Sequence, residues 1–186
     1  MSRSRRLGRR RFLQSAASGA AAAAAGCGGA RSPWRYFTAA EGETLAALCD
    51  QIIPPDQDPG ATAAGVLDFI DRQMNRRFKE HQGTYRDGLA ALDRIARRLH
   101  GSGFAKTPFE KQTEMLVAIE QGKLPPKDWN EHSPRAFFDM LVAHTMMGYY
   151  GNPRHGGNRD AVSWKMLGVP IPPVRGRLHY ELPRLA

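Results

Sequence analysis

The sequence predicts an all-α protein, a single helical domain of about five or six helices with a glycine-rich loop and an extended, proline-rich C-terminal tail. Apolar residues recur at the three- and four-residue spacing of amphipathic helices along most of the chain. No segment alternates convincingly at the period of two that is typical of a strand. The helical domain is expected over 38–186, which is long enough for one hydrophobic core.

The first two helices are delimited by caps and turn residues. Thr38 is followed three residues later by Glu41, which predicts a capping box at the start of the first helix. Pro54 and Pro55 end that helix, since proline interrupts the backbone ladder. A second helix is expected over about 63–80. Three of its charged residues have the spacing of paired charges on a solvated face: Asp68, Asp71 and Arg72.

The next helices have similar signals. A third is expected over about 85–100, where Gly101-Ser102-Gly103 follows. Thr107 predicts an N-cap for the fourth, with Pro108 at its first position and Glu110 completing a capping box. Ser133-Pro134 opens the fifth helix in the same way.

The pattern changes at Gly148. The segment 148–158 is rich in glycine with aromatic residues among them, and glycine permits the close approach of another surface. A short helix is expected through 164–166. From about 168 the chain is proline-rich and has no helical period, so we expect a tail that is mobile or laid on a partner.

Residues 1–26 are predicted to be a twin-arginine signal peptide. The chain before Phe12 holds six arginines and no acid, and a short alanine-dominated run follows Leu13. This run is too short and too weakly apolar for a membrane span. Arg9, Arg10, Phe12 and Leu13 stand where a twin-arginine signal has its defining residues. Because this route carries folded proteins out of the cytoplasm, we expect the protein in the periplasm or on the outer face of the cytoplasmic membrane.

Two cleavage sites remain open. The small residues of 23–25 suit ordinary signal peptidase, whereas Ala24-Ala25-Gly26-Cys27 resembles a lipoprotein box that would lipidate Cys27. Residues 27–37 are expected to form a flexible tether.

Charge argues against nucleic acid as a partner. Of 27 basic residues six lie in the leader, which leaves 21 against 18 acidic residues and a net charge of only +3. Cys27 and Cys49 are too few for an iron–sulfur cluster or a cysteine zinc site. Cys49 is expected to be simply buried. We therefore expect no cofactor in this chain.

No catalytic or metal-binding residues are predicted. The six histidines are scattered, and none forms the i, i+4 pair of a helical metal site. His144 is the best catalytic candidate, with a structural role at a helix end as its alternative. The methionines are expected to fill the core rather than bind copper: Met140, Met146 and Met147.

Several passages resemble one known family. They are 44–54, 59–71, 148–160 and 164–168, and together they resemble gluconate 2-dehydrogenase subunit 3, the small subunit of membrane-associated flavin dehydrogenases. The family usually has an aromatic residue where this chain has His155.

The resemblance implies a fold and a role. Such small subunits pair with a large FAD-bearing subunit of the glucose-methanol-choline type, often with a cytochrome c subunit, and the assembly oxidises a sugar, sugar acid or polyol. The small subunit itself has no recognised redox centre. It is thought to help the large subunit fold and to carry it through the twin-arginine translocase, and the complex is held at the membrane by a partner or a lipid anchor.

The resemblance and the glycine–aromatic segment together suggest a contact region for the large subunit. Its expected members are Tyr149, Tyr150, Asn152, Pro153, Gly156, Gly157, Asn158 and Trp164. The alternative is that Tyr149 and Trp164 close the chain's own core. Two other functions remain open: a stand-alone helical periplasmic lipoprotein or binding module, and an enzyme that uses His144 or His155 with a nearby carboxylate.

Overall fold

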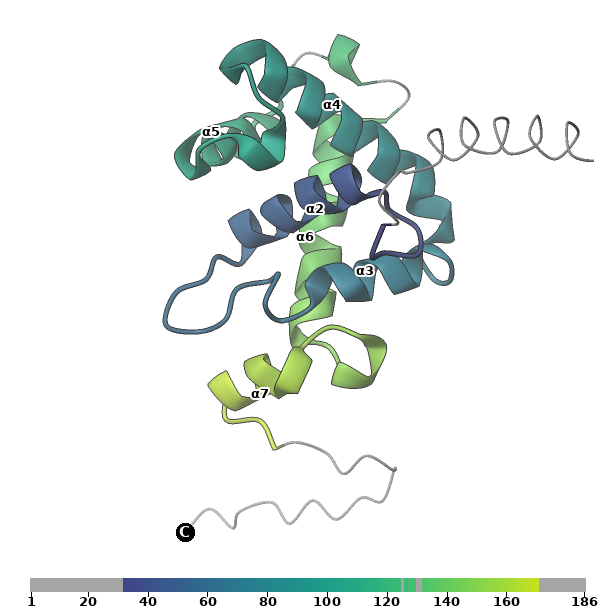
Figure 1. Ribbon diagram of the computed structural model, residues 1–186, viewed down its shortest axis with the longest axis vertical. Coiled ribbons are helices and arrows are strands. Elements are labelled where there is room, and N and C mark those ends of the chain that lie inside the picture. Colours follow the sequence, from purple (N-terminus) through teal and green to yellow (C-terminus); the bar gives the residue numbers. More distant parts are fainter. Residues whose placement is uncertain (1–31, 125, 130–131, 171–186) are drawn as a thin grey trace, which may run out of the picture. The chain divides into compact units, whose positions relative to one another are not determined.

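α-Helices and short 3₁₀ turns make up the regular structure of the computed structural model, which describes residues 32–124, 126–129 and 132–170 (Figure 1). No strand occurs in this part of the chain, which confirms the all-α prediction. The helices are α2 (Ala39–Ile52), α3 (Val66–Met74), α4 (Gln82–His100), α5 (Phe109–Glu120), α6 (Pro134–Tyr150) and α7 (Val162–Met166). Among the described helices none has the length and apolar character needed to cross a bilayer. The predicted export-signal residues Arg9, Arg10, Phe12 and Leu13, the possible lipidation site Cys27 and the predicted tail beyond 170 lie outside the described residues.

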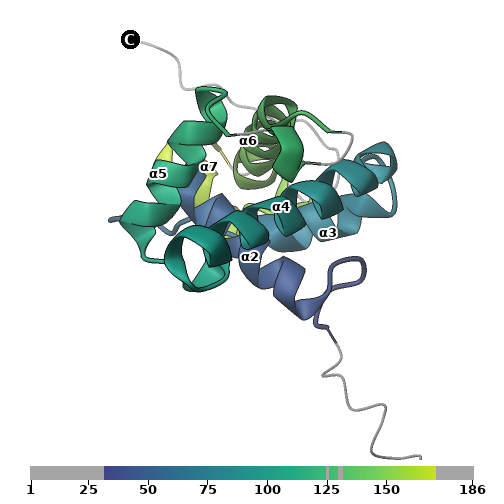
Figure 2. The same cartoon turned by 90° about the horizontal axis from the view of Figure 1, so that it is seen from above.

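Helix α6 is the central element of the domain. It contacts α2, α3, α4, α5 and α7, and Figure 1 shows it running lengthwise behind α2 and α3, which cross it. The view from above in Figure 2 shows α6 nearly end-on beside α4 and α5. The core between these helices is made largely of aromatic and aliphatic side chains, and the largest fully buried ones are Phe37, Tyr85, Phe104, Phe137 and Tyr149.

Two of the expected helix caps are present. At the start of α2, the Glu41 amide donates to Thr38 Oγ1 (3.2 Å) and the Thr38 amide donates to Glu41 Oε2 (2.9 Å), so the capping box is confirmed. At the start of α6, Ser133 Oγ accepts from the Ala136 amide at 3.4 Å. Both caps satisfy amides that have no partner inside their helix.

The cap expected at Thr107 is wrong. Helix α5 begins one residue later than expected, with Pro108 as its N-cap and no side-chain cap bond. The Thr107 hydroxyl instead donates to the carbonyl oxygen of Gly103 at 3.1 Å. Because this bond holds the hydroxyl in the preceding 3₁₀ turn, Thr107 is not available to the helix.

Two boundaries also differ from the prediction. The second helix, expected over 63–80, covers only Val66–Met74, because the Phe78 amide turns back to the Gln73 carbonyl (2.9 Å) and a 3₁₀ turn follows. Gly148, expected to start the loop, lies inside α6. A Cβ at Gly148 would lie 3.0 Å from the Phe69 ring, so this glycine allows α6 to approach α3 closely.

Residues 32–37, expected to be part of a flexible tether, pack against the helices instead. Phe37 is buried in the core. The Asp71 carboxylate accepts from the backbone amides of Arg35 (2.8 Å), Tyr36 (2.8 Å) and Phe37 (3.2 Å). Asp71 is therefore a buried anchor, and its assignment to a solvated face is wrong.

Candidate functional site

The glycine-rich segment folds back onto the end of α6. The buried Asn158 side chain holds it there: Nδ2 donates to the Gly151 carbonyl (2.9 Å) and Oδ1 accepts from the Ser163 amide (3.0 Å). The Ser163 hydroxyl in turn donates to the Tyr149 carbonyl at 2.7 Å. Asn158 has a φ of 46°, a left-handed conformation that asparagine tolerates better than most residues. Its role in the structure is to close this loop.

Two of the expected contact glycines are needed by the chain's own packing. A Cβ at Gly157 would overlap the carbonyl oxygen of Gly148, so loop and helix backbones touch at this point. Gly156 has a φ of 107°, and a Cβ there would lie 2.9 Å from Nη1 of Arg72. Both glycines therefore position the loop against α6 and α3.

Tyr149 faces the core, and Trp164 is half-buried. The Tyr149 hydroxyl donates to the Pro59 carbonyl at 2.7 Å, and its ring is buried. Trp164 Nε1 donates to the Tyr150 carbonyl at 2.9 Å and so ties α7 to the end of α6. The structure thus uses Tyr149 to close the chain's own core, while Trp164 both holds α7 and keeps part of its ring exposed.

Exposed apolar side chains occur at the end of α6, at the end of α7 and in the residues that follow α7. Tyr150 is 37% exposed, and Asn152 is exposed beside it in the chain. Met146 and Tyr150 share a face of α6 because they are four residues apart. We call the following residues the apolar end surface: Met146, Met147, Tyr150, Met166, Leu167 and Val169.

The methionine prediction is wrong for two of the three residues. Met140 does pack on the core, but Met146 and Met147 are 42% and 45% exposed. The sequence already indicated this exposure. The buried face of α6 is centred on Leu141 and Thr145, and helical periodicity places Met146 and Met147 outside that face.

His144 is buried among aromatic rings. Its ring stacks on Phe78 with centroids 3.6 Å apart, and its Nδ1 lies 3.0 Å from the Tyr85 hydroxyl. Burial lowers the pKa of His144 to about 4, with smaller contributions from the nearby charges of His81 and Arg77. In the described residues no carboxylate bonds to His144, so it is not placed as a catalytic base oriented by an acid. His155 lies elsewhere, exposed, and accepts from Arg154 Nε at 3.1 Å.

The buried His144 predicts a loss of stability on acidification. The folded state favours the neutral ring, whereas the unfolded chain binds a proton near its ordinary pKa of 6.5. Stability from this site is therefore full above pH 6.5 and falls as the pH drops towards 4. Between pH 7.5 and 5, we expect the free energy of unfolding, measured with urea, to fall by about 2 kcal/mol more in the unaltered protein than in a His144→Gln variant. His155→Gln is the control, and its free energy of unfolding should fall as much as that of the unaltered protein. An equal fall in the unaltered protein and in His144→Gln would contradict the argument.

Cys49 is buried, as predicted. Thr145 Oγ1 lies 3.5 Å from its Sγ, and burial raises the pKa of the thiol to about 12. The thiol therefore stays protonated, which makes it a poor nucleophile. Across 32–124, 126–129 and 132–170, no three His, Cys, Asp or Glu side chains are grouped to hold a metal ion.

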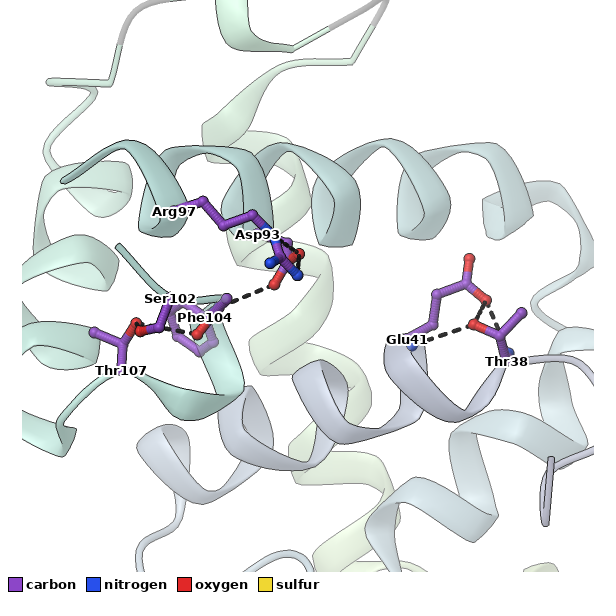
Figure 3. A network of polar contacts seen from close by, with 8 residues as sticks. Thr38, Glu41, Asp93, Arg97, Ser102, Phe104 and Thr107 are labelled. Atoms are coloured by element: carbon purple, nitrogen blue, oxygen red, sulfur yellow. Dashed lines mark hydrogen bonds and ion pairs between the residues drawn. The ribbon is translucent and has the colours of Figure 1, made fainter. Parts of the chain in front are cut away.

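A hollow of ≈ 480 Å³ lies between α2, α4 and the turn at Phe104–Lys106. Figure 3 shows four residues of its lining, Glu41, Asp93, Arg97 and Ser102, with their polar contacts. Asp93 accepts from Arg97 Nε (2.9 Å) and from the Phe104 amide (3.0 Å), so this carboxylate is used to hold the turn against α4. Three acidic and three basic side chains line the hollow, and two of them, Asp93 and Arg97, form an ion pair.

The domain is thus a helical protein in which buried polar groups such as Asp71 and Asn158 serve its own packing, and which exposes apolar side chains on the last turns of α6 and α7. Residues 39–170 match the family gluconate 2-dehydrogenase subunit 3, and the chain belongs to this family. The match runs from the start of α2 to just beyond α7 and so includes every described helix. The comparisons with curated proteins and with solved structures gave no match.

Proposed function

We propose that this chain is the non-catalytic accessory subunit of an exported, flavin-dependent dehydrogenase complex. The catalytic subunit would be a large glucose-methanol-choline type protein with FAD, which oxidises a sugar, sugar acid or polyol and can pass electrons to a cytochrome c subunit. The chain would assist the folding of that subunit and its export by the twin-arginine route, to the periplasm or the outer face of the membrane. The observation that carries the proposal is the family match over all the described helices.

The surface of the domain supports a binding role. The apolar end surface offers Tyr150 and several methionine and leucine side chains, and a group of exposed apolar residues at one place is typical of interaction sites. Tyrosine and tryptophan often supply most of the binding energy of an interface. Of the expected contact residues, we therefore assign direct contact to Tyr150, Asn152, Pro153 and Trp164. Tyr149, Gly156, Gly157 and Asn158 would act by shaping the loop that carries them.

Co-purification tests this function. The chain, expressed with its genomic neighbours and captured by a C-terminal tag, should retain a large subunit with flavin absorbance. Tyr150→Ala should reduce the retained flavoprotein at least tenfold, because truncation of a central interface aromatic costs about 2 kcal/mol or more. Leu99→Ala, which removes a side chain 58% exposed on α4, is the matched control and should retain it fully.

A colourless, stable monomer from the unaltered chain would contradict the proposal. It would favour the alternative, a stand-alone helical lipoprotein or binding module.

A further inference from the structure

Four arginines from three separate segments line one hollow of ≈ 320 Å³. Arg35 comes from the segment before α2, Arg72 from α3, Arg76 from the turn directly after α3, and Arg154 from the glycine-rich loop. Gln73 and His155 complete the lining, and no acidic side chain belongs to it. We call this feature the arginine hollow.

The positive charges of the arginine hollow are not neutralised within the described part of the chain. None of its four arginines forms an ion pair there. The adjacent carboxylate, Asp71, accepts from three backbone amides instead. Elsewhere on the surface, by contrast, Arg97, Arg98 and Arg159 are each paired with an aspartate.

The fold holds the three segments in place. The Arg35 backbone amide donates to the Asp71 carboxylate, which fixes the backbone at Arg35. Gly156 leaves room for the Arg72 guanidinium to lie against the loop, since a Cβ there would be 2.9 Å from its Nη1. The Asn152 side chain accepts from the Arg154 amide at 3.1 Å and so fixes the start of the turn. The positive charges are therefore brought together before any ligand binds, and they repel one another until an anion enters.

We infer that the arginine hollow binds an acidic peptide segment, rich in Asp and Glu, of the partner subunit. The inference rests on the proposed function. Guanidinium groups form paired, charge-assisted hydrogen bonds with carboxylates, and a hollow with several of them accommodates more than one carboxylate. Arg154 follows Tyr150 by only four residues, so the hollow and the apolar end surface lie at neighbouring parts of the chain.

The shape of the site favours a peptide over a membrane. A bilayer presents a flat layer of headgroups, which meets basic residues on a protruding surface more readily than those around a recess. A peptide side chain can enter the recess and place its carboxylate between guanidinium groups.

Charge reversal on two segments tests the inference. Arg76→Glu/Arg154→Glu changes two exposed residues of the hollow, and Arg77→Glu/Lys123→Glu makes the same change in net charge at exposed positions outside it. Binding of a fluorescein-labelled decaglutamate peptide is measured by anisotropy at low salt, and thermal unfolding verifies that each variant folds. We expect the unaltered chain and the control to bind with similar affinity. The hollow variant should bind at least tenfold more weakly.

The same variants are then compared by co-purification with the large subunit, where the hollow variant should lose the flavoprotein and the control should keep it. Equal peptide binding by the hollow variant and the control would overturn the inference. So would binding of the unaltered chain to phosphatidylglycerol vesicles without any binding to the peptide. If the flavoprotein stays with both variants, the inference fails while the accessory function stands; if the unaltered chain retains no flavoprotein, the function itself fails, whatever the peptide shows.

Discussion

Replacing Asp71 by alanine is expected to lower the free energy of unfolding by about 3 kcal/mol, because a buried charged acceptor serves three backbone amides at once. Without the carboxylate, the amides of Arg35, Tyr36 and Phe37 lose their partner. Phe37 would then be held by its apolar contacts and by the bond from the Ser32 hydroxyl to its carbonyl oxygen (2.6 Å). Urea unfolding followed by circular dichroism measures the change.

Asp68→Ala is the matched control on the same helix. Asp68 pairs with Arg159 at 2.7 Å, but both side chains are about half exposed, at 42% and 54%. An exposed pair of this kind contributes only about 0–1 kcal/mol. If the two alanine variants were equally stable, Asp71 would not be the anchor that the hydrogen bonds indicate.

Replacing Gly157 by alanine is expected to destabilise the domain by about 3 kcal/mol, since overpacking against backbone cannot be relieved by a side-chain movement. The new Cβ would overlap the Gly148 carbonyl oxygen. Either the loop moves away from α6, which breaks the Asn158 bond to Gly151, or the helix bends. The loss of stability is measured as a lower midpoint temperature of thermal unfolding.

Gly83→Ala provides the comparison. Gly83 lies in the first turn of α4, and its Cβ would meet only the His132 ring at an ordinary 3.5 Å. Alanine there should leave stability unchanged or raise it by about 0.5 kcal/mol, because alanine favours the helix. A Gly157→Ala protein as stable as Gly83→Ala would show that the loop is free to shift and does not depend on its contact with α6.

The helices could be predicted from the sequence because their signals are local. The Thr38–Glu41 box, the stop at Gly101 and the start at Ser133 each depend on residues within one turn, and each is present in the structure. Cys49 was also placed correctly, since its position in the apolar repeat of α2 determines its burial.

The polar anchors could not be predicted, because they depend on contacts between distant parts of the chain. The spacing of Asp68 and Asp71 gives no indication that one of them meets an amide 34 residues earlier. For the same reason residues 32–37 were assigned to a tether although they belong to the domain.

The candidate site was predicted only in part. A run of glycines with aromatics indicates close backbone approach, and this was correct. Whether the approaching surface is α6 or a partner does not follow from composition, and the structure places α6 against Gly157. The arginine hollow joins three segments whose order in the chain gives no indication that they converge.

The central position of α6 has a consequence for how the chain is made. Ribosomes deliver a protein from its N-terminus, at about 5–20 residues per second. The helix that the four earlier helices α2–α5 all contact is Pro134–Tyr150, close to the end of the described chain. Until it emerges, those helices can pack only on one another and lack the part of the core that α6 supplies. The domain must therefore complete its core late in translation or after release.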